Sequence, residues 1–390
     1  MKLFAYIQER DWAPVTGYVF YVGAVAAGYY YNLTFVQLGL IDLGTRIVGM
    51  THAAVSLVMA AFALLALATA MGSGLAMDRR GWSTDLQVKL RLLLGIISVQ
   101  LALTAAAPSI GSPAQLMAWV VMCSLTLGFG MPVMFSTMID FIPVRDRGYV
   151  SAAVAGLAFF AAALYPLESR IEEISRVLAF GMVPAVTALA VLSVKRFAFV
   201  DRLGRQHEEF GVGRFCAHSH PVRPPGRTFW LLVVLMFGVY FIDSLGFLRI
   251  IEEPVLVAAS WQSSDLGVRW FIALMHVVGA FAAGVLYTNF GRRWLLLWVF
   301  GLFAFTHLQY TFFLRSGADS LPPLLLPMFY VLAVSFYTTL TFALWPDHAS
   351  PETIGVRTGL GVGIAGWLAS FGARRWRCTR NRLACPCSST

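Results

Sequence analysis

Eleven long apolar segments, separated by short polar stretches, dominate this chain of 390 residues. An α-helix needs about 20 apolar residues to cross the hydrocarbon layer of a bilayer, and each segment has roughly that length. Every backbone N–H and C=O group inside that layer must find a partner, and long apolar runs without alternating polarity achieve this as helices rather than as barrel strands. We therefore predict an all-α polytopic membrane protein. The predicted spans are residues 14–38, 51–77, 90–108, 115–139, 149–167, 177–194, 229–250, 267–288, 294–314, 323–345 and 355–372.

The distribution of basic residues predicts how these spans are oriented. With the N-terminus inside, the inner segments hold 18 lysine and arginine residues and the outer loops hold 6. Basic residues accumulate in cytoplasmic loops, so we expect a multi-pass protein of the plasma (inner) membrane with a cytoplasmic N-terminus. The formal net charge is +9. The arginines do not alternate with aromatic residues on a polar surface segment, which argues against nucleic acid as a partner.

One long polar loop divides the spans into two groups. Six predicted spans lie in residues 1–194 and five in residues 229–372, so we interpret residues 195–228 as a cytoplasmic loop between two helical bundles. The last stretch, 373–390, is basic and rich in cysteine and contains no span. We interpret it as an aberrant tail that stands where a further span is expected.

Histidine and cysteine in the polar segments raise the possibility of a metal site. His207, His218 and His220 lie near Cys216 in the central loop, and Cys385 and Cys387 are close together in the tail. Neither spacing matches a closed zinc pattern, so a solvated loop is the preferred interpretation and a metal-binding tail the weaker alternative. We predict no metal and no cofactor.

The sequence repeats weakly at an offset of 210 residues. This offset maps the first span of the first group onto the first span of the second, and likewise for later spans. An even number of spans per unit gives a parallel repeat, related by an axis along the membrane normal. The fold expected is two six-helix bundles with the twelfth helix apparently missing. The identical pairs are Gly28 and Gly238, Tyr30 and Tyr240, Gly74 and Gly284, Gly81 and Gly291, and Arg147 and Arg357.

A loop motif occurs twice at this offset, after the second span of each group. The first copy reads GLAMDRRGWS and the second GVLYTNFGRR. These copies resemble the motif Gly-x-Leu-Ala-Asp-Arg-x-Gly-Arg-Arg of the major facilitator superfamily, and the resemblance covers residues 14 to about 372. Each copy departs from the motif in a different place: the first lacks its last basic residues and the second lacks its Asp-Arg pair. The matching residues are Gly74, Asp78, Arg79 and Gly81, then Gly284, Gly291, Arg292 and Arg293.

The resemblance implies that this motif controls the conformation of the protein. Asp78 at a helix end can accept charge-assisted hydrogen bonds, and the glycines permit a tight turn. A second pair of loops contains Asp140 and Arg147 in one copy and Arg357 in the other. In the resembled family this region packs against the motif, so Arg147 is the expected partner of Asp78. The alternatives are a basic loop that only anchors topology and two ordinary turns.

One carboxylate, that of Asp243, lies inside a predicted span. A charge is costly there, so an ionisable residue in a span is a functional candidate by default. Asp243 shares a helical face with Tyr240 and Ser244 through three- and four-residue spacing. In the resembled fold this face would confront Tyr30, Thr34 and Gln37 of the first span across a central cavity. Asp243 can then bind a proton or a cationic substrate. The alternative is an internal ion pair with Arg249.

These observations predict an ion-coupled secondary active transporter that moves a small solute by alternating access. Its expected partners are the solute, protons or sodium, and lipid, and the chain is expected to act as a monomer. No P-loop supports ATP-driven transport and no catalytic motif supports an enzyme. The alternative function is a transport-inactive relative that acts as a sensor or assembly partner. His276, His307 and the polar face of span 10 (Tyr330, Tyr337, Thr338 and Thr341) are weaker cavity candidates.

Overall fold

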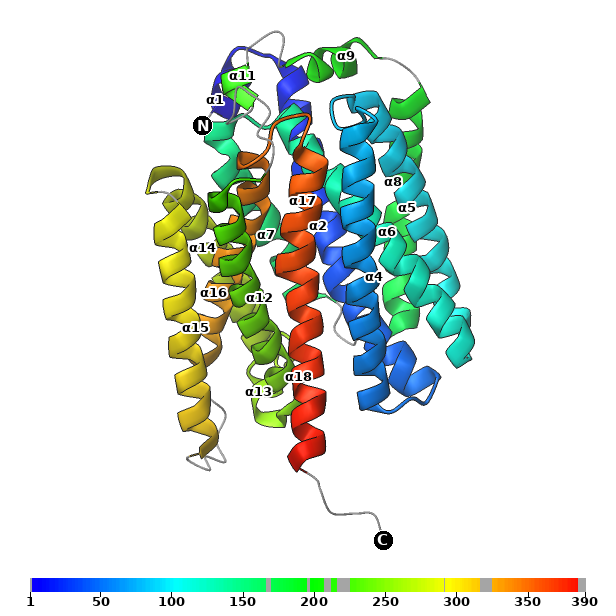
Figure 1. The fold of residues 1–390 in the computed structure, drawn as a ribbon, viewed down its shortest axis with the longest axis vertical. Coiled ribbons are helices and arrows are strands. Elements are labelled where there is room, and N and C mark those ends of the chain that lie inside the picture. The colour runs from blue at the N-terminus through cyan, green and yellow to red at the C-terminus, as the bar shows by residue number, and fades with distance from the viewer. Residues whose placement is uncertain are drawn as a thin grey trace.

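The computed structural model describes residues 2–165, 170–194, 197–206, 212–215, 225–290, 292–315 and 325–384. All regular elements within these ranges are helical. Ten of the described helices are long and apolar enough to cross a membrane. They run roughly side by side in one bundle, as Figure 1 shows. The described chain therefore has the all-α polytopic architecture that the apolar segments predict.

The part before the central loop begins with the short helix α1 (Lys2–Gln8). After residues 9–11 comes the first long helical run, whose four elements are continuous with one another. They are α2 (Trp12–Tyr31), the π-helical η1 (Asn32–Leu38), α3 (Gly39–Asp42) and the π-helical η2 (Leu43–Ile47). The remaining elements up to the loop are α4 (His52–Arg79), α5 (Leu86–Ala106), η3 (Ala107–Ser109), α6 (Pro113–Phe141), η4 (Val144–Asp146), α7 (Arg147–Leu164) and α8 (Ile171–Val194).

Two short helices, α9 (Ala198–Gly204) and α11 (Val212–Phe215), belong to the central loop. The part after it contains α12 (Arg227–Glu252), α13 (Pro254–Ala258), α14 (Leu266–Asn289), α15 (Arg292–Arg315), α16 (Leu325–Asp347), α17 (Ile354–Val362), the π-helical η5 (Gly363–Leu368) and α18 (Ala369–Ala384). The last three form one continuous helix.

Side chains at the helix starts satisfy backbone donors that have no partner inside the helix. The Thr51 hydroxyl accepts from the backbone N–H of Ala54 (3.3 Å), and Ser112 does the same for Gln115 (3.3 Å). Asp85 accepts from two N–H groups at the start of α5, and Asp265 from one at the start of α14. Serine, threonine and aspartate are the side chains that cap helices best, and here they mark where polar loops become spans.

Two predicted spans end well before their helices do. The first helical run continues past residue 38 to Ile47, because two π-helical stretches keep the backbone bonded through the polar segment. It ends just before Gly49, which adopts a φ of +73° that a side chain would disfavour. The last run continues past residue 372 to Ala384, so much of the basic tail is helical. Arginine is a good helix former, which explains how the helix extends beyond its apolar part.

The most extensive packing between the parts before and after the loop is at two helix crossings, α4 against α17 and α7 against α14. Both crossings are backbone contacts. A Cβ added at Gly74 would collide with the backbone of Gly355, and one at Gly284 would lie 2.9 Å from the backbone oxygen of Gly148. Small residues allow such approach in membranes, where no hydrophobic force drives helices together. The two motif glycines related by the 210-residue offset therefore occupy equivalent contacts.

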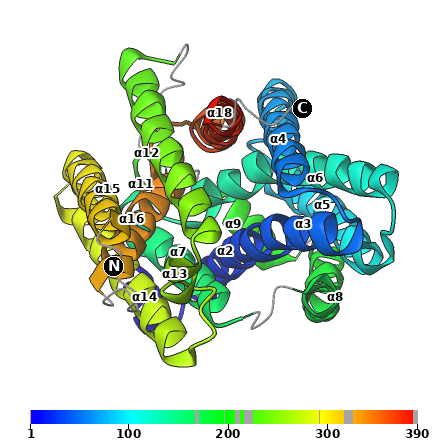
Figure 2. The same cartoon turned by 90° about the horizontal axis from the view of Figure 1, so that it is seen from below.

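The two ends of the bundle differ. One end carries α1, α9, α11 and the N-terminus, and we call it the α1 end; the opposite end carries the C-terminal part of α18 (Figure 1). Seen from the α18 end, α18 lies between α12 and α4 (Figure 2). Both glycine crossings lie toward the α1 end, because Gly74 is close to the last residue of α4 and Gly284 to the last residue of α14.

We predict that Gly74→Leu destabilises the protein by about 1–3 kcal/mol or more, because overpacking at a backbone contact forces the helices apart. Gly72→Leu is the matched control, since a Cβ at Gly72 meets nothing within 4 Å. Thermal unfolding in detergent, followed by thiol-reactive fluorescence, measures both. Equal melting temperatures for the two variants would show that the crossing tolerates separation.

Candidate functional site

A cavity of about 220 Å³ lies between the parts of the chain before and after the central loop. Its walls come from the first helical run, α4, α6, α7, α12, α14, α16 and the last helical run. The lining residues sit in the middle of these helices and toward the α18 end: Met59 is early in α4, for example, and Phe159 is late in α7. The cavity thus extends from the bundle centre toward the α18 end.

Asp243 contributes a carboxylate to this cavity, and two tyrosines of α16 hold it in place. The hydroxyl of Tyr330 donates to one carboxylate oxygen and that of Tyr337 to the other, both at 2.8 Å. The alternative of an ion pair with Arg249 was wrong, because Arg249 donates to the Thr311 hydroxyl (3.3 Å) instead. Within the described residues no basic side chain pairs with Asp243. Its charge is therefore stabilised by neutral hydrogen-bond donors alone.

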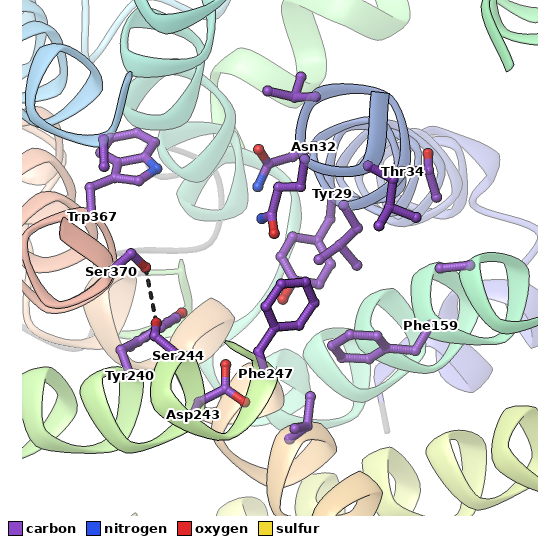
Figure 3. Close-up of a pocket in the computed structure, with 18 of the residues that line it drawn as sticks. Tyr29, Asn32, Thr34, Phe159, Tyr240, Asp243, Ser244, Phe247, Trp367 and Ser370 are labelled. Atoms are coloured by element: carbon purple, nitrogen blue, oxygen red, sulfur yellow. Dashed lines mark hydrogen bonds between the residues drawn. The ribbon is translucent and has the colours of Figure 1, made fainter. Parts of the chain in front are cut away.

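Five of the six residues expected around a central cavity line this one: Thr34, Gln37, Tyr240, Asp243 and Ser244. Tyr240 exchanges a hydrogen bond with the Thr341 hydroxyl (3.1 Å). Ser244 does so with Ser370 (3.2 Å), the contact drawn in Figure 3. Tyr30 does not line the cavity, and its hydroxyl donates to the backbone oxygen of Tyr165 (3.3 Å).

Several lining residues were not anticipated from the sequence. The neighbouring Tyr29 takes the place expected for Tyr30. The run is π-helical from Asn32 to Leu38, and a π-helical turn brings together residues five apart, such as Tyr29 and Thr34. Trp261, Trp367 and Ser370 also line the cavity. The only available signal was the three-residue spacing of Trp367 and Ser370, which puts them on one face of the last span.

The two membrane histidines differ in position. His276 lines the cavity, stacks on Phe159 with 4.4 Å between ring centroids, and bonds to the Ser335 hydroxyl through Nδ1 (2.8 Å). His307 packs near Gly246 and does not line the cavity. No described group of three or more His, Cys, Asp or Glu residues could hold a metal ion. His207, Cys216, His218, His220, Cys385 and Cys387 lie outside the described residues.

Asp78 joins α4 to the start of α17 at the α1 end. Its carboxylate accepts from the backbone N–H groups of Gly355 (3.0 Å) and Val356 (2.8 Å) and from the Ser83 hydroxyl (2.5 Å). A carboxylate is stabilised at a helix N-terminus, where N–H groups lack partners and the helix dipole is positive. The motif acid of one part of the chain therefore caps a helix of the other. Gly81, just beyond, adopts a φ of +69° that suits glycine, and Arg79 is exposed.

Arg147 does not bind Asp78, so that expectation was wrong. Its buried guanidinium donates to the Asp347 carboxylate (2.6 Å) and to the backbone oxygen of Phe215. Tyr287 donates to the other Asp347 oxygen. The physical reason is geometric: Asp78 faces the α17 start at one crossing, whereas Arg147 starts α7 at the other crossing.

A second buried ion pair lies within the first group of spans. Lys89 of α5 and Asp140 of α6 approach to 2.7 Å, with side chains that are 1% and 5% exposed. Lys89 is one of the 18 basic residues whose distribution predicts the orientation of the spans. The sequence did not identify it as the partner of Asp140. Removing one member of such a buried pair leaves the other charge uncompensated.

The remaining motif residues lie at the same end. Arg357 is buried, with its guanidinium 4.8 Å from the Phe229 ring centroid. Arg293 is exposed at the start of α15. Arg292 is the first residue of that helix, but its side chain, like Gly291, lies outside what the structure describes.

The N-terminal helix also joins this end of the bundle. Asp146 is buried and accepts from the backbone N–H groups of Lys2 (2.7 Å) and Leu3 (3.2 Å) and from the Tyr18 hydroxyl (2.6 Å). Arg214 of α11 bonds to the hydroxyl of Tyr6. The α1 end is therefore closed by segments from the N-terminus, the central loop and both groups of spans.

The chain shares its fold with solved structures of membrane proteins. The human organic anion transporter MFSD10 superposes with a TM-score of 0.62 at 15% identity, over 95% of this chain and 94% of that one. The major facilitator superfamily proton:xylose symporter XylE gives 0.63 at 14% identity, over 95% and 90%. The partially occluded inward-open form of E. coli XylE gives 0.58 at 13% identity, over 93% of each chain. No family model and no curated protein matches the sequence.

We predict that Asp78→Asn loosens the α1 end. The amide keeps one acceptor oxygen but loses the charge and the second acceptor, which removes about 1–3 kcal/mol from the sealed arrangement. A cysteine at Ser370, in a background without the native cysteines, should then react faster with an impermeant maleimide added from the α1 side. Asp85→Asn is the control, because asparagine caps a helix as well as aspartate does. An unchanged rate in Asp78→Asn would mean that this carboxylate does not hold the seal.

Proposed function

From the major facilitator fold of this chain, we propose that it is a secondary transporter that moves a small solute by alternating access. The observation that carries the proposal is a cavity between the two groups of spans that extends toward the α18 end, while Asp78 and the Arg147–Asp347 pair bridge the groups at the α1 end. Breaking these bridges while closing the α18 end would expose the same cavity to the other side. That is the alternating-access scheme of rocking bundles.

The proposed moving units are the two groups of spans, residues 1–194 and 229–372. Residues 195–228 would connect them in the cytoplasm, and 373–390 would form the basic tail. The motif residues Gly74, Asp78, Gly284 and their neighbours would act in conformational control rather than in solute binding. One chain supplies both walls of the cavity, so a monomer suffices for this mechanism.

We assign ion coupling to Asp243. A carboxylate can bind a proton when the cavity faces one side and release it when the cavity faces the other. The phenols of Tyr330 and Tyr337 fix its position. Tyr29, Tyr240, His276 and Arg374 are the other titratable or charged groups that line the cavity.

The first test uses proteoliposomes with an imposed pH gradient. A panel of sugars, amino acids, organic acids and organic amines is offered, and accumulation is expected for at least one solute and should collapse when a protonophore is added. Asp243→Asn should abolish that accumulation, because an amide cannot release a proton. Asp265→Asn, which makes the same charge change at an exposed helix cap, should accumulate as the parent does.

Two outcomes contradict this proposal in different ways. Retained proton-driven accumulation in Asp243→Asn would remove the coupling role from this carboxylate. A protein that inserts correctly but moves no solute of the panel would favour the alternative of a sensor or assembly partner.

The proposed orientation places the α1 end in the cytoplasm. In a variant without native cysteines, Thr84→Cys would then be protected from an impermeant maleimide in intact cells, and Ser112→Cys would react. Thr84 follows α4 at the α1 end and Ser112 precedes α6 at the other. The reverse labelling pattern would invert the topology and with it the direction in which the cavity opens.

A further inference from the structure

We propose that the cavity selects organic cations, in particular amines with an aromatic or alkyl body. This inference rests on the proposed function, because it names the class of solute that the same cavity would bind. Three observations carry it: the charge of Asp243, the way that charge is hydrogen-bonded, and the aromatic residues that surround it.

The carboxylate of Asp243 has acceptor capacity to spare. A carboxylate has about four lone-pair positions, and the two tyrosine hydroxyls use one on each oxygen. In the described chain no lysine, arginine or histidine pairs with this group. Figure 3 shows the Asp243 side chain near Phe247, among the residues that line the cavity. A cationic group entering there would meet a fixed negative charge that has lost much of its hydration and has no competing counter-ion.

Aromatic rings provide the rest of the binding surface. Tyr29, Tyr240, Phe247, Trp261 and Trp367 all line the cavity. Phe247 stacks on Trp261 with 5.6 Å between ring centroids, which holds both rings in place. A cation within about 6 Å of a ring centroid is attracted to the ring face, most strongly by tryptophan, and an apolar body gains from the same surface. Aromatic residues around an acidic group are typical of sites that bind ammonium ions.

One positive charge also lines the cavity, at a different depth. Arg374 lies four residues after Ser370 in α18, which places it roughly 6 Å nearer the α18 end along the helix. Its guanidinium donates to the Met59 sulfur (3.2 Å), and both residues line the cavity. In the part of the cavity farther from the α18 end, the charge is therefore that of Asp243 on α12. Tyr330 and Tyr337 of α16 bond to it there.

The test measures equilibrium binding to the purified full chain in detergent, so it does not depend on transport. The probes are radiolabelled benzyltrimethylammonium, which is cationic, and benzenesulfonate, an anion of similar size. We expect the parent to bind the cation at least tenfold more tightly than the anion. Asp243→Asn should weaken cation binding at least tenfold, while Asp265→Asn should leave it unchanged. Phe247→Leu should weaken it several-fold without reversing the preference.

The comparison of probes in the parent protein keeps the inference falsifiable even if a variant misfolds. Equal binding of the two probes, a preference for the anion, or parental cation affinity in a folded Asp243→Asn would each overturn it. Failure of the proposed function has a different signature: the protein would bind the cation but carry no solute in proteoliposomes. Conversely, proton-driven uptake of an anion or a sugar, without cation binding, would overturn this inference alone.

Discussion

Backbone contact between helices of opposite groups is the constraint on which the arrangement of this protein depends. Helices in lipid gain little from burying apolar surface, so they associate through close packing and hydrogen bonds. The crossings at Gly74 and Gly284 bring two backbones together at the α1 end. The cavity lies away from these crossings, in the middle of the bundle and toward the other end. Close backbone packing and the open cavity thus occupy different depths of the same helices.

Hydrogen bonds and an ion pair of charged side chains also join the helices at these crossings. Asp78 uses backbone donors at the α17 start, and Arg147 and Asp347 pair across the second crossing. Buried ion pairs seldom add much net stability, but losing one partner costs about 3–5 kcal/mol. Such contacts therefore favour one packed arrangement over others more than they raise overall stability. That property suits a protein that is proposed to alternate between two arrangements.

Sequence patterns could predict the helices because lipid leaves few alternatives for an apolar run of this length. The repeat and its loop motifs also pointed to the relative placement of Gly74 and Gly284. The partners of individual charges could not be predicted in the same way. Asp78 binds backbone N–H groups of α17, and no residue type in the sequence marks such a partner. Arg147 pairs with Asp347, which lies 200 positions away in the sequence. Tyr29 replaces Tyr30 at the cavity because the first helical run becomes π-helical at Asn32, which the apolar pattern does not reveal.

The fold itself does not specify the solute. The superposed structures include a transporter named for organic anions and one named for xylose, which shows that one architecture accommodates different chemistry in its cavity. For this chain the discriminating information is local: a carboxylate, two phenols that orient it, and a set of aromatic rings. None of these belongs to the loop motifs by which the sequence resembles the major facilitator superfamily.

The adjacent residues Asp146 and Arg147 connect three distant segments through a single peptide bond. Asp146 holds the first turn of the chain, while Arg147 holds α11 and the end of α16. A shift of α7 that separates Arg147 from Asp347 must therefore also displace or carry along the N-terminal helix. The N-terminal helix and the central loop are thus linked to the crossing of α7 with α14. A displacement of either one would change the contacts between the two groups of spans.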